Sequence, residues 1–421
     1  MSAPHALTLD ALFRRAGVRN AQALALADPP NRAAFTDGAP RTLTYAEADR
    51  AISAFAATLR GLGLHAGTVV GLQLPNTVEN AVALLGALRA GMVAAPLPLL
   101  WRRQDMTEAL GRAGAKAIVT AGRIGAFAHA ELAMEVAAEL FPIRQICAFG
   151  GNLPDGVVPL DGIFANAASE PPPHRNGDAA STVAITFECS ADGYLPVLHD
   201  HAHLLAAGAS LALAGGFTAE MPILSTIPPA TFAGLAVTLM PWLIAGGALH
   251  WHHGFDAEAF ATQTAALENA AVVLPGPALP ALTVSPSRKI VALWRAPLGL
   301  AAEIPVLNAV DAVCRDEAAI TAAARDSDGL PDPAVIAAAD NPPAPGMIGV
   351  GAYQFRQAAL DAAIAAADPA AMIAALPDGL LGNRLAGHAP DAARVAATLA
   401  TRGANALVAG AFKSIGRISA A

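Results

Sequence analysis

Short apolar segments alternate regularly with helical patterns through the first third of the chain. Thr44 and Glu47 form a capping-box pattern that predicts the start of one helix, and Asn76 with Glu79 predicts the start of the next. The strands expected between the helices are residues 69–74, 92–97 and 115–120. Strands that alternate with helices predict an α/β fold with a largely parallel sheet covered on both faces.

Composition narrows the class of protein. The chain has 421 residues, of which 54% are hydrophobic and 14% charged, so it can bury a large core and is not expected to be disordered. A net charge of -8 argues against a broad nucleic-acid surface. The three cysteines (Cys147, Cys189 and Cys314) form no CxxC pair, which suits a reducing cytoplasm, and the N-terminus lacks a signal-peptide pattern. We therefore expect a cytoplasmic protein.

One uncharged stretch, residues 223–249, is long enough to cross a bilayer. Prolines and glycines interrupt it, and no basic cluster flanks it to set an orientation. A buried helix in an alanine-rich core explains this stretch better than a membrane span. Farther along, residues 323–346 are rich in turn formers and are expected to be a linker.

Beyond these patterns, the order of segments resembles a known family. Residues 41–120 (RTLTYAEADR to AKAIVT) resemble the N-terminal region of AMP-forming acyl-CoA synthetases. Residues 224–260 and 272–282 resemble the family's substrate-side segments, and 359–391 are similar to part of its small C-terminal domain. The resemblance implies stacked α/β layers over residues 1–345, followed by a shortened C-terminal α/β remnant over 346–421.

The resemblance also implies an ATP site, and its first part is a glycine-rich loop with a lysine that holds the triphosphate. The matching stretch departs from that pattern. It has one glycine, places no lysine at the lysine position and contains two acids that would repel phosphate. The loop-remnant residues are Thr186, Glu188, Ser190, Asp192, Gly193, Leu195 and Pro196. This departure predicts a loop that does not bind phosphate.

The family's adenine and magnesium motif is also altered. It matches a stretch in which Asn308, Val310, Asp311 and Asp316 are the remnant residues, and the aromatic stacking face is gone. Asp311 or Asp316 could replace the family's magnesium ligand. The family's ribose aspartate and hinge have no counterpart, and its closing lysine corresponds only weakly to Arg417, which positions its donors differently.

The same comparison gives candidates for an acyl pocket. Thr231 stands where many relatives have a histidine, and Trp294 stands at one of two paired glycines ahead of the adenine motif. The candidates are Thr231, Phe232, Gly234 and Trp294. For Phe232 and its apolar neighbours Leu235, Met240, Trp242 and Leu243, core packing is an equally good explanation.

Histidines cluster at two places, 199–203 and 250–253, and could suggest a metal site. The resembling family has a similar histidine-containing helix start without a metal, so we expect none. Cys189 and Ser190 lack the surroundings of a catalytic nucleophile.

Together, these departures favour a catalytically inactive pseudo-ligase that serves as a binding, structural or regulatory subunit, with no confident cofactor. The alternative is a diverged acyl- or aryl-CoA ligase that uses ATP, magnesium and CoA. A third reading is a half-enzyme completed by a partner chain. We expect a protein partner or homo-oligomer and an acyl or aryl ligand, and neither nucleic acid nor a membrane span.

Overall fold

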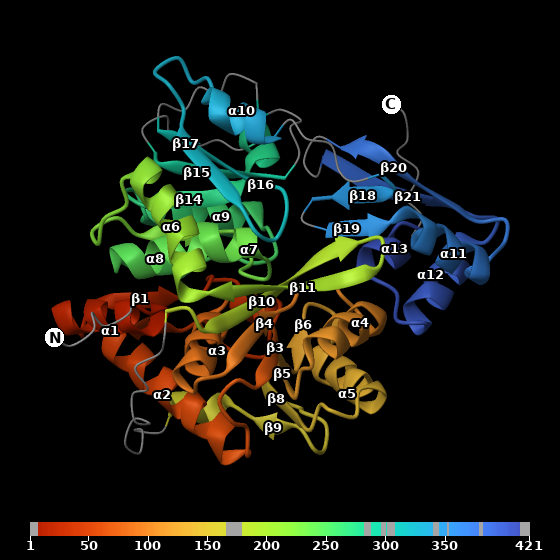
Figure 1. Ribbon diagram of the computed structural model, residues 1–421, viewed down its shortest axis with the longest axis horizontal. Coiled ribbons are helices and arrows are strands. Elements are labelled where there is room, and N and C mark those ends of the chain that lie inside the picture. Colours follow the sequence, from red (N-terminus) through yellow and green to blue (C-terminus); the bar gives the residue numbers. More distant parts are fainter. Residues whose placement is uncertain are drawn as a thin grey trace.

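Two sheets and a C-terminal segment make up the molecule (Figure 1). The structure is a computed structural model that describes residues 7–165, 179–281, 288–295, 300, 308–339, 345–351, 353–378 and 382–412. Arg417, the candidate for the family's closing lysine, lies outside the described residues, as does most of the proline-rich stretch 165–180.

The first sheet has seven strands in the order β11-β10-β4-β3-β5-β8-β9, and all except β11 run parallel to their neighbours. Its strands are β3 (Val69–Gln73), β4 (Val93–Pro96), β5 (Ala117–Ala121), β8 (Gln145–Phe149), β9 (Val158–Pro159), β10 (Thr182–Ser190) and β11 (Gly193–Asp200). The three strands expected from the sequence are β3, β4 and β5, which confirms the predicted alternation. A small hairpin of β6 (Arg123–Ile124) and β7 (Phe127–Ala128) follows β5.

Helices cover both faces of this sheet because its strands present apolar side chains in both directions. On one face, α2 (Tyr45–Gly61) and α3 (Val78–Arg89) share a core with Val70 and Val119. On the other face, α4 (Arg103–Ala113) and α5 (His129–Glu139) pack on Ile118. Thr44 and Glu47 form the expected capping box of α2. The sheet is therefore buried on both sides, as predicted.

The start of α3 differs from the prediction. Thr77 is its N-cap residue, without a side-chain cap bond, whereas the Asn76 side chain donates to the His252 carbonyl 3.0 Å away. Glu79 points instead to Arg32, at 2.6 Å. Asn76 and Glu79, which resemble helix-capping residues in the sequence, therefore connect the start of α3 to His252 and to Arg32.

The second sheet has eight strands in the order β17-β16-β15-β14-β12-β13-β1-β2, antiparallel only at its two ends. Its strands are β1 (Leu24–Ala27), β2 (Thr42–Thr44), β12 (Ile223–Ser225), β13 (Leu249–Trp251), β14 (Ala271–Pro275), β15 (Ile290–Trp294), β16 (Ala309–Cys314) and β17 (Ile320–Ala324). Both sheets share one core with α1 (Leu9–Arg19), α6 (His201–Gly215) and α8 (Met240–Ala245). On the far side lie α9 (Ala257–Ala266) and α10 (Pro333–Ala339). The architecture is the expected stack of α/β layers.

The uncharged stretch 223–249 is not one helix. It forms β12, the short α7 (Phe232–Gly234), a π-helical turn at Leu235–Leu239, then α8 and β13. Gly246 ends α8 with a φ of 71°, a conformation that favours glycine. Among the described residues, no helix combines the length and apolar character needed to span a membrane.

The C-terminal segment has its own core, which includes Phe355, Leu360, Val395, Leu399 and Phe412. Its elements are β18 (Met347–Val350), β19 (Tyr353–Arg356), α11 (Gln357–Ala367), β20 (Met372–Asp378), β21 (Gly382–His388), α12 (Ala392–Thr401) and α13 (Ala406–Gly410). The predicted linker 323–346 is wrong in part, because it contains the end of β17 and all of α10. The division at residue 345 stays a prediction.

This segment docks on the first sheet beside α4 (Figure 1). The Gln104 amide donates to the Gly403 carbonyl, and the Ala406 amide donates to the Leu100 carbonyl, both at 3.0 Å. Arg356 and Glu108 form an ion pair at 3.1 Å. Backbone hydrogen bonds fix the contact more firmly than side-chain pairs alone would.

Candidate functional site

The stretch expected to be a phosphate loop is a closed hairpin. β10 and β11 pair from Thr182 to Asp200, and the turn has only two residues because Ser190 lies opposite Gly193. Thr186, Glu188, Leu195 and Pro196 all belong to the paired strands. Successive residues of an extended strand point their groups to opposite sides, whereas a phosphate cradle needs successive amides directed at one point.

The tip of this hairpin is packed against α4. The Tyr194 hydroxyl donates to Asp105 at 2.8 Å, the Tyr194 amide donates to Glu108 at 3.2 Å, and Arg112 donates to the Asp192 carbonyl. Gly193 has a φ of 111°, and a Cβ there would lie 1.6 Å from the Glu108 carboxylate. The lone glycine of the stretch is thus required by its backbone conformation and by a close approach to α4.

Next to the hairpin lies a hollow of about 30 Å³, which we call the small hollow. Glu188 accepts from the Glu317 amide at 2.8 Å. Glu317 in turn accepts from the Phe232 amide at 2.6 Å and from Arg295 at 3.1 Å. Thr231 lines the same hollow and accepts from the Gly234 amide at 3.2 Å, capping α7. A space of this size holds about one water molecule.

Charge in the small hollow is unfavourable for a phosphate chain. Burial raises the pKa of the Glu188 carboxyl to about 7, against the opposing effect of its bond from the Glu317 amide. Among the described residues, Arg295 is the cation that lines this hollow, and Glu317 already pairs with it. Glu317 was missed in the sequence. Its only signal was its position in the charged run Arg315, Asp316 and Glu317 after an apolar strand.

Trp294, which the resemblance places ahead of the adenine motif, is buried in the fold. Its side chain is 1% exposed, and a Cβ on Gly276 would lie 2.2 Å from its ring. The indole Nε1 donates to Asp311 at 2.7 Å, and Asp311 forms an ion pair with Arg325 at 2.8 Å. Val310 precedes Asp311 in β16 and is fully buried. Trp294 therefore occupies space beside Gly276 instead of leaving it open.

The two acids considered for magnesium have other partners. Asp311 is enclosed by Arg325 and Trp294, which engage its carboxylate in an internal ion pair and a hydrogen bond. Asp316 accepts from the Ala318 and Ala319 amides, both at 2.9 Å, and so closes a turn. Across the described ranges, no group of three His, Cys, Asp or Glu residues is arranged to hold a metal ion.

A chain of hydrogen bonds links the first histidine cluster to the hairpin. His203 Nε2 lies 2.6 Å from the Ala318 carbonyl, His203 Nδ1 lies 3.2 Å from His199 Nδ1, and His199 Nε2 lies 2.7 Å from the Thr186 hydroxyl. Because a carbonyl only accepts, His203 Nε2 donates, and in neutral rings His199 Nδ1 donates to His203 while Thr186 donates to His199. Burial lowers the pKa of His199 to about 4. Thr186 is thus engaged inside the fold.

The remaining candidates lie in different parts of the fold. Ser190 donates to the Gly193 carbonyl at 3.0 Å, and Leu195 is 41% exposed on β11. Phe232 stacks on His199 with ring centroids 5.1 Å apart. A Cβ on Gly234 would lie 2.0 Å from the Pro228 carbonyl, so this glycine is required by packing. Asn308 immediately precedes β16. Thus Glu188 and Thr231 meet in one hollow, while Trp294 and Asp311 meet in another cluster.

This geometry can be set beside known proteins. A sequence model of the AMP-binding enzyme family matches residues 22–277, more than half of the chain. The chain belongs to the AMP-binding enzyme family. The match covers the whole first sheet and most of the second, together with the hairpin, the substrate-side segment 224–260 and the first part of the segment 272–282.

Curated relatives match shorter parts of this family member. The Mycobacterium tuberculosis salicyl-AMP ligase / salicyl-S-ArCP synthetase is 30% identical over 208 residues, covering 49% of this chain and 35% of that protein. The bovine long-chain fatty acid transport protein 1 is 34% identical over 157 residues, covering 35% of this chain and 24% of that protein. The aligned regions therefore span about a third or less of these relatives.

Solved structures agree on the fold. Mycobacterium smegmatis MbtA in its apo form has a TM-score of 0.66 and 19% identity, covering 96% of this chain and 90% of that one. The amide bond synthetase McbA from Marinactinospora thermotolerans has a TM-score of 0.69 and 15% identity, covering 96% and 94%. At these identities the likeness concerns architecture, and this chain has the same stacked layers as these two proteins.

Proposed function

We propose that this member of the AMP-binding enzyme family does not adenylate a substrate at the hairpin, and that it serves as a binding, structural or regulatory subunit. The observation that carries this proposal is the closed two-residue turn between β10 and β11. A triphosphate needs converging donors, and here the strands carry side chains to alternate sides.

Electrostatics supports the same proposal. Glu188 and Glu317 both approach the small hollow, and Arg295 is already paired with Glu317. Two carboxylates with one engaged cation would oppose a highly charged triphosphate. The volume of about 30 Å³ is also far below the several hundred cubic ångströms of usual ligand pockets.

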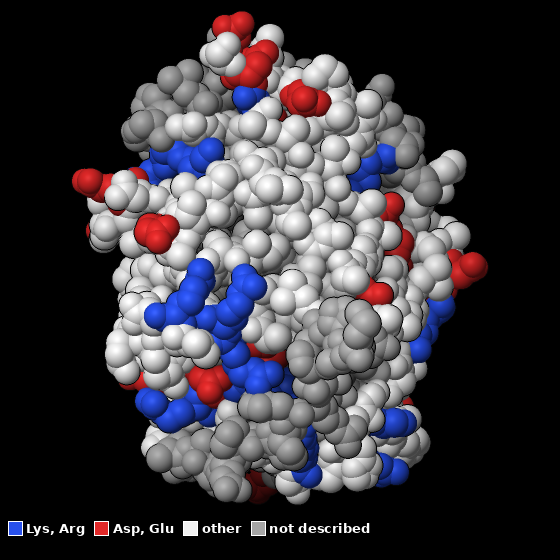
Figure 2. Space-filling view, turned by 60° about the vertical axis from the view of Figure 1, so that its left-hand side comes forward, with Lys and Arg blue, Asp and Glu red and all other residues white. Residues whose placement is uncertain are grey.

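The proposal includes an acyl or aryl ligand and a protein partner or second copy of the chain, and a cytoplasmic location. The ligand class is supported by the names of the relatives, which include a salicyl-AMP ligase and long-chain-fatty-acid–CoA ligases. The face shown in Figure 2 is mostly uncharged, apart from a group of basic side chains to the left of its centre. A mostly uncharged surface suits contact with another protein.

Titration of the full chain with ATP and magnesium by calorimetry tests the proposal. A flat trace at millimolar ATP is expected, and salicylate or a long-chain fatty acid should give no pyrophosphate exchange. Carboxylate-dependent exchange, abolished together with ATP binding when Glu188 is changed to Arg, would overturn it. Exposed Arg144 changed to Gln serves as the control for nonspecific effects of substitution.

A second candidate function is that of a diverged acyl- or aryl-CoA ligase, favoured by the same relatives, which carry ligase names. ATP and magnesium, and then CoA, would be its cofactors, with Arg417 in the role of the closing lysine. In that case Arg417→Ala should abolish carboxylate-dependent exchange, whereas Arg402→Ala should not. An unchanged rate in the Arg417 variant would count against the assignment.

A further inference from the structure

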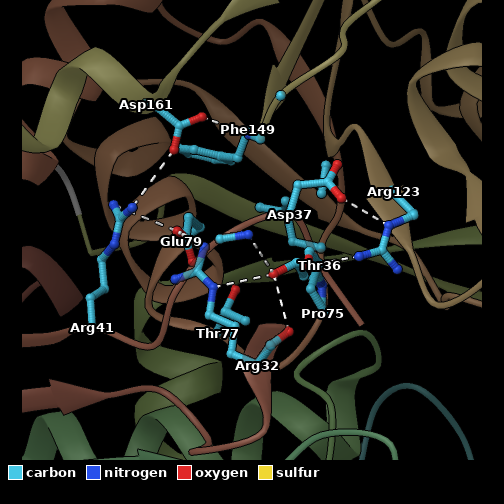
Figure 3. Close-up of a pocket in the computed structure, with 15 residues that line it drawn as sticks. Arg32, Thr36, Asp37, Arg41, Pro75, Thr77, Glu79, Arg123, Phe149 and Asp161 are labelled. Carbon is cyan, nitrogen blue, oxygen red and sulfur yellow. Dashed lines mark hydrogen bonds and ion pairs between the residues drawn. The ribbon is translucent and has the colours of Figure 1, made fainter. Parts of the chain in front are cut away.

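A second, larger hollow of about 360 Å³ lies at the carboxyl ends of β3, β5 and β8, and we call it the large hollow (Figure 3). Residues 36–41, between β1 and β2, close one side of it, and Asp161 closes another. It shares no lining residue with the small hollow. The carboxyl ends of parallel strands are where α/β sheets usually bind ligands.

Two of its three arginines are already engaged. Arg32 is 4% exposed and donates to Thr36 and Glu79, and also to Asp28. Arg123 donates to Asp37 at 2.9 Å and to the carbonyls of Gly125 and Thr36 at 2.7 and 2.8 Å. These two guanidiniums hold the walls of the large hollow together.

The third arginine, Arg41, has a side-chain nitrogen without a hydrogen-bond acceptor. Arg41 Nη1 is buried and has no hydrogen-bond partner, and its ion-pair distance to Glu79 Oε1 is 3.7 Å, beyond hydrogen-bond reach. Its guanidinium carbon lies 4.0 Å above the Phe164 ring, which fixes the plane of the group. A guanidinium group held in one plane, with two nitrogens that can donate in parallel, suits a carboxylate ligand.

Close to Arg41, the Glu79 carboxylate has an oxygen without a hydrogen-bond donor. Glu79 is 1% exposed and lines the large hollow, and its Oε2 atom is buried without a hydrogen-bond partner. A buried carboxylate oxygen without a donor is costly, and an ammonium group would satisfy it. The acids that line the hollow, Asp37, Glu79 and Asp161, equal its three arginines in number, so a ligand that carries one charge of each sign is favoured.

We propose that the large hollow binds a free apolar α-amino acid, with its carboxylate on Arg41 and its ammonium group on Glu79. The spare donor and the spare acceptor belong to side chains 3.7 Å apart, so one ligand must present both charges close together. An α-amino acid carries them on a single carbon atom. Inorganic phosphate fits less well, because Glu79 and Asp161 flank Arg41.

The apolar part of the ligand follows from the remaining wall. Leu74, Pro75, Ala121 and Phe149 also line the large hollow, between the charged groups. These side chains exclude water from a hydrocarbon or aromatic group and offer it no hydrogen bond. Leucine and phenylalanine are therefore the probes, and glycine should bind much more weakly.

Calorimetric titration of the full chain at neutral pH provides the test, with L-phenylalanine, L-leucine, glycine, 3-phenylpropionate and phenethylamine as probes. One saturable site is expected for phenylalanine or leucine, and at least about tenfold weaker binding for each of the other three. No binding of either amino acid at about 10 mM would overturn the proposal. Equal affinity for 3-phenylpropionate, or competition by inorganic phosphate at equal concentration, would overturn it as well.

Variants locate the site. Arg41→Gln, at a partly exposed side chain, should weaken binding at least about tenfold, and Glu79→Gln should do the same if it folds. Arg144→Gln, at an exposed side chain outside the large hollow, should leave the affinity unchanged. An Arg41→Gln variant that folds and binds phenylalanine as tightly as the natural chain would overturn the proposal.

Discussion

The small hollow and the large hollow lie at carboxyl ends of strands in the same fold, yet one holds about 30 Å³ and the other about 360 Å³. In the small hollow, Glu188 accepts from the Glu317 amide, and the Glu317 carboxylate is bonded to Arg295 and the Phe232 amide. In the large hollow, Arg41 and Glu79 each keep an atom without a partner. The fold determines where a ligand site can lie, and the side chains determine whether it is open.

The largest effect is expected at the ion pair beside Trp294. Changing Asp311 to Ala should lower the free energy of unfolding by about 3–5 kcal/mol, because Arg325 would remain buried without its carboxylate. Urea unfolding measures this loss. Asp316→Ala, at an exposed turn, should cost about 1 kcal/mol. A magnesium-dependent gain in stability that disappears in the Asp311 variant would contradict the internal pairing and reopen the region as a metal site.

A smaller effect is expected where Trp294 packs on Gly276. Gly276→Ala should cost about 2 kcal/mol, because the added methyl group would meet the indole ring at 2.2 Å. Trp294→Leu should relieve that clash, so the double variant should be more stable than the two single effects predict, by at least about 1 kcal/mol. Gly61→Ala, where a Cβ meets nothing within 4 Å, is the matched control. Strictly additive effects would mean that the two residues do not close this region together.

A pH-dependent effect of about 1 kcal/mol is expected at Glu188. Its pKa is raised by burial from 4.5 to about 7 in the folded protein, so the folded state holds a costly buried charge above pH 7 and none below about pH 4.5. Glu188→Gln should therefore be more stable than the natural chain at pH 8 and equally stable near pH 4.5, with the gain reduced by partial solvent access. Thermal unfolding at the two pH values measures it. A gain of the same size at both would show that the charge of Glu188 is not the cause.

The smallest effect is expected at the contact between the C-terminal segment and α4. Arg356→Gln removes a partly exposed ion pair to Glu108 and should cost about 0.5 kcal/mol or less. The backbone bonds at Gln104 and Ala406 should hold the segment in place, so limited proteolysis between residues 339 and 353 should not accelerate. Rapid cleavage in this variant would show that the ion pair, more than the backbone contact, keeps the segment beside the small hollow.

The layers of the fold could be predicted from the sequence because they depend on local patterns. The strands near 69, 92 and 115 alternate with helical patterns, and such spacing predicts a covered parallel sheet without knowledge of distant contacts. The stretch 223–249 shows the limit. Its apolar character was clear, but the π-helical turn at Leu235–Leu239 depends on how α6 and α8 pack.

Site residues were harder to predict because their partners lie far along the chain or on another strand. Asp311 meets Arg325, 14 residues away, only because β16 and β17 pair in one register. Glu79 resembles a helix-capping acid in the sequence, yet Arg32 lies 47 residues before it. Cross-strand and long-range pairs of this kind leave no periodic signal, so the large hollow could not be found before the fold was known.

The tight turn of the hairpin has a consequence for how the chain can change. A single substitution can replace Glu188 or Asp192, but it cannot add the residues that a phosphate-binding loop requires between paired strands. Only an in-frame insertion could do so, and it would have to detach Tyr194 from α4 at the same time. Point mutation alone therefore cannot restore a phosphate-binding loop in this region. New activities can arise more readily at other places in the fold.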